Sequence, residues 1–432
     1  MEQTSIIPMT KTMIEILERI KQNQEAIISW LESHERSKEL PLYTSLDIRD
    51  AGFKVSVVDT NLFPAGFNNL CEHGLADSVK FIKEAVLKRV PGCQNILIVA
   101  EEHTRNTWYL ENIRILQQII EQAGFRVRIA TFLSIQPDFC DSAKYVELET
   151  ATQQSVKVFC FKRILSEFEA GRDDIDLIIL NNDLTTGIPE ILKKTNVPIY
   201  PSIQAGWHAR HKSHHFCIVN DLIKEFAKIL NMDPWLFSCL FSVQDQVNIN
   251  VDTDRQKLAD LANDLFKRIA IKYKEHAIKE KPYIVVKSDS GTYGMGVLPV
   301  EDPAEILNLN RKERNKLYKG KSSQVIERYL LQEGVLTIHN IDHEVSEVVI
   351  YQIENNLIGG FYRSHSGKGE RDNLNSQGMN FKKMCPHLKK YGDCGVHHDV
   401  SIFDVYRILA RIGGIAAHRE ITQLEGTKEN FK

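Results

Sequence analysis

The sequence predicts an α/β protein in which a doubly wound parallel N-terminal domain is followed by an α+β region. From Ala76 to Tyr200, short β-branched runs alternate with amphipathic helical stretches, a rhythm typical of a parallel sheet covered by helices. Beyond residue 280, strand patterns follow one another across short turns, which indicates antiparallel hairpins. At 432 residues the chain is too long for one compact core, so we expect more than one packed unit.

Composition limits the classes of function. The formal net charge is −3, and no surplus of basic residues favours nucleic acid or an anionic membrane. No apolar run approaches the length of a membrane span, and the N-terminus lacks the apolar core of a signal peptide. We expect a cytoplasmic protein that acts on small molecules, without nucleic-acid or membrane partners, and we leave open whether it forms a homo-oligomer. The eight cysteines are expected to be free thiols in a reducing compartment.

Residues 1–44 are predicted to be a helical segment, because apolar side chains between residues 9 and 32 recur at helical spacing. The next unit, residues 45–215, opens with a strand from Lys54 to Asp59 and a loop rich in Asn, Gly and Pro. Ligands of open α/β sheets bind at such strand ends. The polar residues around this strand are therefore candidate substrate contacts, with simple turn formation as the alternative; they are Arg49, Asp59, Asn61, Asn68 and Asn69.

The alternating pattern continues through the rest of this unit. Buried strands are predicted at residues 95–100, 125–132, 175–180 and 197–200, and helices at residues 75–88, 106–123 and 188–194. A basic, histidine-rich loop then precedes a predicted helix from Cys217 to Leu230. Arg210 and Lys212 in this loop are suited to bind a carboxylate or phosphate. A zinc site formed by the nearby histidines and a solvated basic loop are the alternatives; the histidines are His208, His211, His214 and His215.

Residues 216–432 form the predicted α+β region, and its most informative stretch follows a long polar helix at residues 252–281. A strand at residues 283–287 ends in Lys287 and is joined to a second strand by a turn that contains Gly291, Gly294 and Gly296. Glycine-rich loops let free backbone N–H groups surround an anion such as phosphate. The lysine precedes the glycines and no helix follows them, so the pattern matches neither the common P-loop nor a dinucleotide fingerprint. An ordinary hairpin is the alternative.

Further strands and a polar loop complete this region. Residues 323–333 are predicted to end in a hinge at Gln332 and Glu333 that could present backbone groups to an adenine ring, and residues 344–360 form a hairpin around Asn355 and Asn356. The loop after Arg363 combines positive charge with the oxygen ligands that a hard cation prefers. A helix is expected from Ser401 to Arg419. A zinc site is an alternative reading of the residues before this helix; they are Cys385, His387, Cys394, His397 and His398.

The order of these motifs resembles the ATP-grasp ligases, and residues 344–378 are similar in layout to bacterial glutathione synthetase. Four segments resemble the proteobacterial glutamate–cysteine ligase family more closely: DTNLFPAGFNNL from Asp59, AGWHARHKSHHF from Ala205, KSDSGTYGMGV from Lys287 and GGFYR ending at Arg363. The resemblance runs from about residue 45 to about residue 420. It implies ATP-dependent formation of γ-glutamylcysteine from glutamate and cysteine through an acyl phosphate, with Mg²⁺ as counter-ion of the nucleotide.

The resemblance also implies roles for individual residues. Catalytic roles fall to Lys287, Arg363 and Arg371, and nucleotide binding to Lys287, Ser290, Gly291, Thr292, Tyr293, Gly294, Gly296, Gln332 and Glu333. The amino-acid substrates are expected at Arg49, Asn61, Asn68, Arg210 and Lys212, and Mg²⁺ at Glu333, Glu347, Asp372, Asn373 and Asn375. One departure is that glutathione synthetases carry a metal-binding E-x-N strand near the C-terminus, which this chain lacks after Gly395.

Two alternative functions follow from these observations. The first keeps the fold and changes the substrates, as in glutathione synthetase or a dipeptide ligase. The second is a binding or regulatory protein that keeps a nucleotide pocket without turnover, which the missing E-x-N strand would favour.

Overall fold

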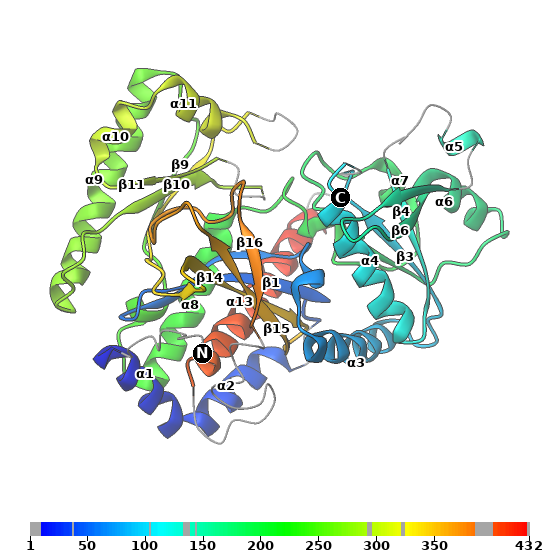
Figure 1. The fold of residues 1–432 in the computed structure, drawn as a ribbon, viewed down its shortest axis with the longest axis horizontal. Helices are drawn as coiled ribbons and strands as arrows, with labels where there is room; N and C mark the ends of the chain where they lie inside the picture. The colour runs from blue at the N-terminus through cyan, green and yellow to red at the C-terminus, as the bar shows by residue number, and fades with distance from the viewer. Residues whose placement is uncertain are drawn as a thin grey trace.

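The computed structural model describes residues 10–36, 39–102, 105–132, 139–142, 145–291, 296–320, 325–384 and 401–429. These residues form an α/β protein in which helices pack around a mostly parallel sheet, a central antiparallel sheet and a smaller antiparallel sheet. In Figure 1 the parallel sheet lies to the right and the smaller antiparallel sheet forms a lobe at the upper left. The α/β class expected from the sequence is confirmed.

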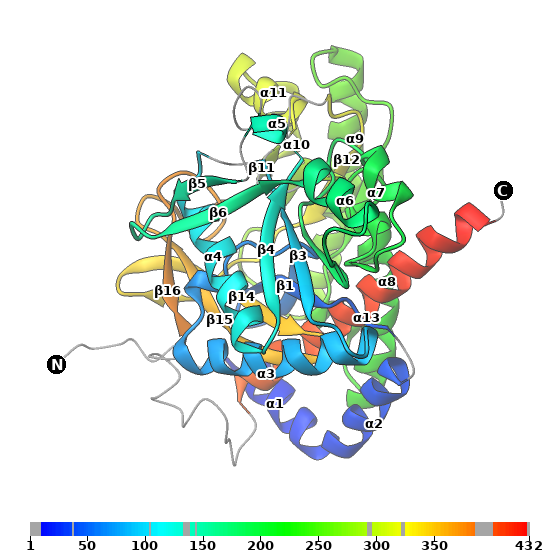
Figure 2. The ribbon, with the colours of Figure 1, turned by 90° about the vertical axis from the view of Figure 1, so that its right-hand side faces the viewer.

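The parallel sheet has the strand order β5-β6-β4-β3-β7-β8, and only β5 runs antiparallel to its neighbour. Its strands are β3 (Asn95–Ala100), β4 (Arg126–Thr131), β5 (Val146–Glu149), β6 (Ser155–Cys160), β7 (Leu177–Asn181) and β8 (Ile199–Tyr200). Residues from α3 (Glu72–Arg89) and α4 (Thr107–Gln122) join one hydrophobic cluster with Ile96 and Ile98. Residues from α6 (Phe161–Glu169) and α7 (Glu190–Lys194) join another with Leu97 and Val99. Helices therefore cover both faces (Figure 2).

Cysteine pairing differs from the sequence-based expectation. Cys140, in the short helix α5 (Phe139–Ser142), forms a disulfide with Cys160 at the end of β6. Cys71 is also disulfide-bonded, whereas Cys93, Cys217 and Cys239 are free. The expectation of free thiols was wrong for the bonded residues. Cys140 and Cys160 are 20 residues apart in the sequence, and only the fold brings their Cα atoms to 5.3 Å, a distance that a disulfide can span.

The central antiparallel sheet joins the two ends of the chain. Its order is β16-β15-β14-β1-β2, with β13 also paired to β14. From the N-terminal side come β1 (Tyr43–Asp50) and β2 (Val55–Asn61), and from the C-terminal side β13 (Asn340–Ile341), β14 (Glu344–Ile353), β15 (Asn356–His365) and β16 (Asn380–Lys383). The predicted 344–360 hairpin is confirmed. The strand expected at Lys54 to Asp59 exists as β2, but it pairs with β1 in this sheet and takes no part in the parallel one.

The smaller antiparallel sheet has the order β11-β10-β12-β9. Its strands are β9 (Phe241–Gln244), β10 (Ile284–Ser288), β11 (Val297–Val300) and β12 (Tyr329–Glu333), and the lobe also contains α9 (Asp252–Glu275), α10 (Pro303–Leu307) and α11 (Arg311–Tyr318). The hairpin predicted around the glycine-rich turn is confirmed, since Lys287 at the end of β10 pairs with Val297 of β11.

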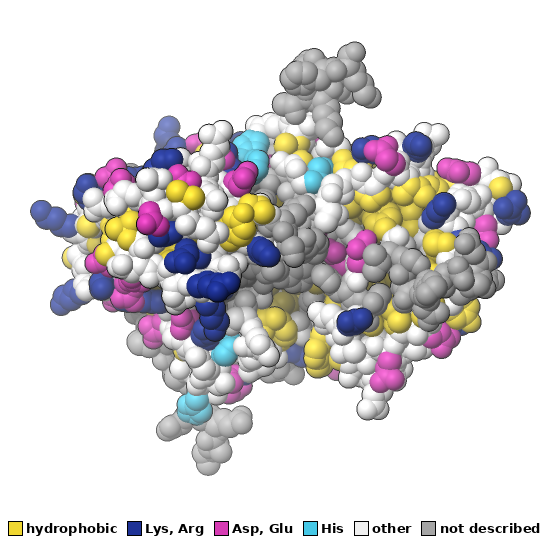
Figure 3. Space-filling view, turned by 90° about the horizontal axis from the view of Figure 1, so that it is seen from above, with side chains coloured by type: hydrophobic (Ala, Val, Ile, Leu, Met, Phe, Trp, Pro, Cys, Tyr) yellow, Lys and Arg dark blue, Asp and Glu magenta, His cyan; other side chains and the backbone are white. Residues whose placement is uncertain are grey.

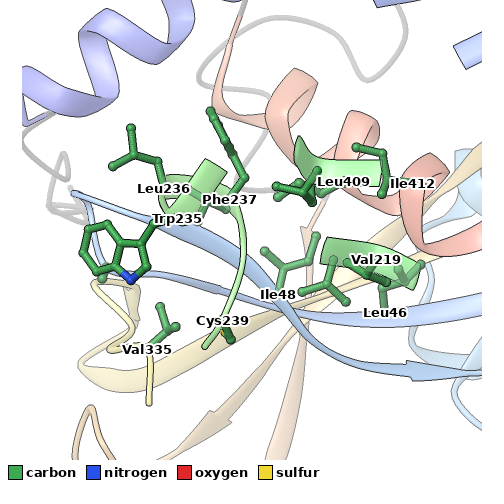
Figure 4. Close-up of a cluster of buried hydrophobic side chains, with 14 of the residues drawn as sticks. Leu46, Ile48, Val219, Trp235, Leu236, Phe237, Cys239, Val335, Leu409 and Ile412 are labelled. Carbon is green, nitrogen blue, oxygen red and sulfur yellow. The ribbon is translucent and has the colours of Figure 1, made fainter. Parts of the chain in front are cut away.

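Long helices close the core beneath the central sheet. They are α1 (Lys11–Gln22), α2 (Gln24–Glu35), α8 (Lys212–Leu230) and α13 (Ile402–Glu429), with short 3₁₀ turns η1 (Phe67–Asn69), η2 (Ile203–Ala205) and η3 (Pro234–Phe237). Figure 4 shows Ile48 of β1, Val219 of α8, Phe237 of η3 and Leu409 of α13 in one buried cluster. Among the described helices, none is both long and apolar enough to cross a membrane.

Several helix boundaries differ from the prediction: α9 ends at Glu275, α13 extends to Glu429, and two further differences concern α1 and α8. The N-terminal segment contains two helices that meet at Asn23, which ends α1 and precedes α2. Helix α8 begins at Lys212 rather than at Cys217, so Lys212 and His215 lie on the helix and not in the preceding loop. The sequence predicts a loop for these basic residues, and in the structure they stand in the first turn, where basic side chains oppose the helix dipole.

Candidate active site

A cavity lies between the central sheet and the lobe. Its walls include Asp47, Asp59 and Glu347 of the central sheet, Lys287 and Gln332 of the lobe, and further residues named below. Of the residues singled out from the sequence, those that line it are Arg49, Asp59, Lys212, Lys287, Ser290, Gly291, Gln332, Glu333, Glu347, Arg371, Asp372, Asn373 and Asn375. The fold thus gathers most of the described candidates around one space, although some of them lie more than three hundred residues apart in the chain.

Lys287 projects into this cavity from the end of β10. Its Nζ donates to the backbone oxygen of Val58 at 3.0 Å and to Oε1 of Gln332 at 2.6 Å. The side chain is buried, and burial together with the nearby Lys212 ammonium lowers the pKa of Lys287 to about 8. A partly desolvated ammonium that faces another cation is a favourable partner for an incoming anion.

Carboxylates face these lysines from the hairpin of β1 and β2. Asp59 of β2 is the cross-strand partner of Asp47 on β1, and Asp59 accepts a hydrogen bond from Nζ of Lys212. Burial alone would raise the pKa of Asp59, but Lys212 and Lys287 outweigh it and hold that pKa below its usual value. Burial, reinforced by Glu347 and Asp59, raises the pKa of Asp47 despite its contact with Arg363. Negative charge is therefore crowded on this wall.

Two arginines organise the same wall. Arg363 of β15 binds Oδ2 of Asp47 at 2.8 Å and Oε1 of Glu347 at 2.5 Å. Arg49 of β1 binds the other oxygen of Glu347 at 2.6 Å, and its remaining nitrogens donate to the backbone oxygens of Glu370 and Asp372 at 2.9 and 2.8 Å. Arg49, expected to bind substrate, thus holds the loop after β15 against the sheet.

The hinge residue Glu333 has a buried side chain. Its carboxylate binds Lys54 at 2.7 Å, Nε1 of Trp235 at 2.9 Å and the backbone N–H of Leu240 at 2.9 Å. The side chain proposed as a metal ligand is therefore engaged in a buried ion pair, while the residue still forms part of the cavity wall at the end of β12.

The loop after β15 and the glycine-rich turn bound the cavity on the lobe side. Nη1 of Arg371 binds Glu301 at 2.8 Å, and a carboxylate oxygen of Asp372 accepts from the N–H of Gly369 at 2.8 Å. Gly291 and Gly296, the described glycines of the turn, have φ of 97° and 64°, values that side chains adopt at a cost. Glycine is therefore required by the backbone at both positions.

Positively charged side chains also lie on the surface of the lobe. Seen from above, Lys and Arg side chains gather on the lobe side of the molecule (Figure 3). Helix α11 of the lobe contributes Arg311, Lys312, Arg314 and Lys316.

Several expected residues lie away from the cavity wall. Arg210 forms a buried, two-point ion pair with Glu420 of α13, to which His215 also binds. Asn68 bonds to its neighbour Asn69, and Arg363, Asn61 and Gly296 are not among the residues that line the cavity. Within the described part of the chain, the histidine-rich stretch brings no three metal-binding atoms together. Thr292, Tyr293, Gly294, Cys385, His387, Cys394, His397 and His398 lie outside the described residues.

Sequence reasoning missed Asp47 altogether and treated Asp59 only as a substrate contact. Both line the cavity. Asp59 and Asn61 have the acid-x-Asn spacing that was sought near the C-terminus, and they lie on β2, next to β1 and two strands from β14. Only Asp59 of this pair lines the cavity.

Comparisons with known proteins identify the family of the chain. The family model described as glutamate-cysteine ligase matches residues 18–421. The chain belongs to the glutamate–cysteine ligase family. A crystal structure from Methylobacillus flagellatus KT, provisionally named gamma-glutamylcysteine synthetase, is 34% identical with a TM-score of 0.84 and covers 97% of this chain and 98% of that one. The search of curated proteins gave no match.

More distant solved structures include the D-cycloserine synthetase DcsG, with 8% identity and a TM-score of 0.39 over 76% of this chain and 82% of that one. The D-alanyl-alanine synthetase A of Vibrio cholerae O1 biovar eltor str. N16961 has 12% identity and a TM-score of 0.34 over 74% and 81% of the two chains. These scores are too low to support an argument. As a glutamate–cysteine ligase, the protein is an enzyme that forms γ-glutamylcysteine at the expense of ATP.

Proposed function

We propose that the cavity between the lobe and the central sheet is the place where this ligase activates glutamate and joins it to cysteine. The observation that carries the proposal is the opposition of a buried lysine, Lys287, to the paired carboxylates Asp47 and Asp59 across one space. An ATP-dependent ligase needs cations for the phosphates and carboxylates for a metal counter-ion, and few other reactions require both sets so close together.

The nucleotide is assigned to the lobe. Lys287 and the backbone around Ser290 and Gly291 would contact the phosphates, and the end of β12 at Gln332 and Glu333 would border the adenine. In this reading residues 216–432 supply an ATP-grasp-like region, residues 45–215 a doubly wound unit with substrate loops, and residues 1–44 a helical segment. The strand pairing of Lys287 with both β11 and β12 gives the lysine a rigid base.

A divalent cation fits the donors of the opposite wall. Asp47, Asp59 and Glu347 line the cavity with carboxylates, the ligand type that Mg²⁺ prefers, and burial and neighbouring acids raise the pKa of Asp47, as expected where anions crowd before a cation binds. The oxygens of Asp372, Asn373 and Asn375 border the same space. When bound, Mg²⁺ would neutralise phosphate charge. The Glu333 carboxylate binds Lys54 and the Glu347 carboxylate binds Arg49 and Arg363, so either would have to exchange an ion-pair partner to bind the cation, and Asp47 and Asp59 are the first choice.

The chemistry requires two displacements. An oxygen of the γ-carboxylate of glutamate attacks the terminal phosphorus of ATP, and the bond to ADP breaks, leaving an acyl phosphate. The amine of cysteine then attacks the acyl carbon; the amide bond forms, phosphate leaves and the amine loses a proton. Lys212 and Arg371 line the cavity and would stabilise negative charge on the transferred group. Arg363 does not line the cavity and would contribute indirectly, by holding the carboxylates of Asp47 and Glu347 in place.

The experiment that tests the proposal measures phosphate release with ATP, Mg²⁺, glutamate and cysteine, and then with each amino acid omitted. Full turnover should need both amino acids, and the product should be γ-glutamylcysteine by mass. Lys287→Ala should lower kcat/KM for ATP at least 100-fold, because the buried ammonium is lost while β10 keeps its strand partners. Near-normal turnover of a folded Lys287→Ala protein would place the nucleotide elsewhere.

A further inference from the structure

A buried carboxylate, Asp289, lies just beyond the strand that carries Lys287. Its side chain is fully buried and accepts hydrogen bonds from the backbone N–H of Ser213 at 2.7 Å, from the hydroxyl of Ser213 at 2.6 Å and from Nε of Arg328 at 2.6 Å. These donors come from the first turn of α8 and from the segment that leads into β12. Asp289 thus connects three parts of the chain at the base of the glycine-rich turn.

Backbone hydrogen bonds at Asp289 strengthen the same connection. Its carbonyl accepts from the N–H of Lys212 at 2.6 Å, and its own N–H donates to the carbonyl of Arg328 at 3.1 Å. His211, the N-cap of α8, makes no side-chain cap hydrogen bond. The carboxylate therefore caps α8 from a distant strand, where the positive end of the helix dipole favours an anion.

The position of Asp289 links the two lysines of the cavity. Lys287 precedes it by two residues, and Lys212 is the first residue of the helix that Asp289 caps. Both ammonium groups lie close to Asp59: Lys212 binds its carboxylate, and Lys287 binds the backbone oxygen of the preceding residue. Two cations repel each other at such short range, so a fixed connection between their backbones is needed to keep them together.

We infer that Asp289 is a positioning residue of the ligase reaction, which sets Lys212 of α8 in register with Lys287 of β10 on either side of Asp59. The inference rests on the proposed function, since it assumes that the cavity is the site of reaction. It assigns a role in the reaction to a side chain that does not line the cavity. When the nucleotide binds Lys287 and the adjoining turn, Asp289 keeps the Lys212 ammonium close enough to contact the transferred phosphoryl group.

The test compares Asp289→Asn with Asp302→Asn. The asparagine keeps the size of the side chain and one acceptor oxygen, but it loses the charge that binds Arg328 and the helix end. Asp302 is a matched control because it caps α10 of the same lobe, accepting from the N–H of Ala304 at 2.8 Å, without contacting α8. Ser213→Ala is a milder variant that removes only the hydroxyl donor and serves if Asp289→Asn does not fold.

The first readout is the rate at which an N-hydroxysuccinimide acetate reagent acetylates Lys212, measured by peptide mass spectrometry relative to the exposed Lys193. Lys212 is mostly buried and ion-paired, so its acetylation should accelerate at least threefold in Asp289→Asn, less in Ser213→Ala and not in Asp302→Asn. An unchanged rate in both Asp289→Asn and Ser213→Ala overturns the inference. This readout does not need turnover.

The second readout is kcat per nucleotide-binding site, counted by equilibrium binding of ATP so that unfolded protein does not contribute. We expect at least a tenfold loss in Asp289→Asn with a change in the dissociation constant for ATP below threefold, because β10 and Lys287 are intact. Equal losses in Asp302→Asn would contradict a positioning role. Absence of ligase turnover in the unaltered protein would instead contradict the proposed function, while the acetylation result would still decide the position of Lys212.

Discussion

At the scale of single residues, the site depends on charges that burial makes expensive unless they are paired. Lys212 binds Asp59, Arg363 binds Asp47 and Glu347, and Lys54 binds Glu333. Lys287 differs, since its recorded partners are the neutral oxygens of Val58 and Gln332. A buried ammonium with neutral partners is the group most ready to accept an anionic ligand.

The lowered pKa of Lys287 predicts how ATP affinity depends on pH. With a pKa of about 8, the ammonium is charged below pH 8 and neutral above it, whereas the phosphates are already deprotonated there. Because ATP binds the charged form, the dissociation constant should be flat below pH 8 and rise by about tenfold per pH unit above it. Isothermal titration between pH 7 and 10 measures this, and Lys287→Met should remove the dependence. A flat profile in the unaltered protein would contradict the assignment.

The Asp59→Asn variant tests whether Asp59 binds Mg²⁺. Asp59→Asn keeps the shape of the side chain but removes the charge that Lys212 and a divalent cation would share. The Mg²⁺ concentration at half-maximal turnover should rise at least tenfold, and kcat should fall by about 100-fold, since both partners lose their position. Turnover is measured across a Mg²⁺ series, with Asp302→Asn as the control. An unchanged Mg²⁺ dependence would remove Asp59 from the metal site.

At the scale of elements, local patterns predicted hairpins well and predicted sheet membership poorly. The β10–β11 hairpin and the β14–β15 hairpin pair neighbouring segments, so alternation and turn residues suffice to find them. Strand β1 is buried at every position although it contains Thr44, Asp47 and Arg49. Asp47 and Arg49 bind Arg363 and Glu347, about three hundred positions away in the chain, and no local signal reports such partners.

The same limit explains the candidate site. Lys287, the glycine turn and the loop after Arg363 could be predicted because each is a local motif. The role of Arg49 and the exclusion of Arg210 from the cavity wall depend on Glu347 and Glu420, which belong to distant elements. Asp47 required knowledge that β1 lies beside β14. Long-range pairing, rather than residue type, decided these cases.

The close packing of α3 against the central sheet predicts that enlarging a residue at this contact lowers the stability of the protein. A Cβ added to Gly74 of α3 would come within 2.3 Å of the backbone oxygen of Ile358 on β15, so Gly74→Ala must push the helix from the sheet. We expect the free energy of unfolding in urea to fall by about 1–3 kcal/mol. Gly426→Ala in α13 meets nothing within 4 Å and should be neutral or stabilising by up to about 1 kcal/mol. Equal effects would show that α3 approaches β15 less closely.

At the scale of the whole molecule, hydrophobic clusters cross the boundaries that the sequence suggested. One cluster contains Ile98 of the parallel sheet together with Tyr43 and Tyr351 of the central sheet. Another extends from the N-terminal Ile16 through the central sheet to Leu331 of the lobe. Shared cores of this kind usually unfold together. We therefore expect that the sequence-based division near residue 215 does not separate two units that unfold independently.

Tryptophans on either side of that boundary allow a direct measurement. Trp207 is buried near the parallel sheet, where its backbone N–H donates to the carbonyl of Asp183 at 2.9 Å, and Trp235 is buried against Phe53 and Tyr273. Variants that keep one of these tryptophans, with the other three replaced by phenylalanine, report each region by fluorescence. Both should give the same urea midpoint, because hydrophobic clusters join the parallel sheet to the central sheet and the central sheet to the lobe.

Ligand binding extends the prediction to the complete enzyme. ATP with Mg²⁺ at 100 times its dissociation constant should stabilise the folded state by about 2.7 kcal/mol, and both tryptophans should register the same shift if one cooperative unit binds the nucleotide. A shift seen only by Trp235, or midpoints that differ without ligand, would show that the lobe unfolds apart from residues 45–215. The domain division drawn from the sequence would then hold, and the site would lie at a joint between separable parts.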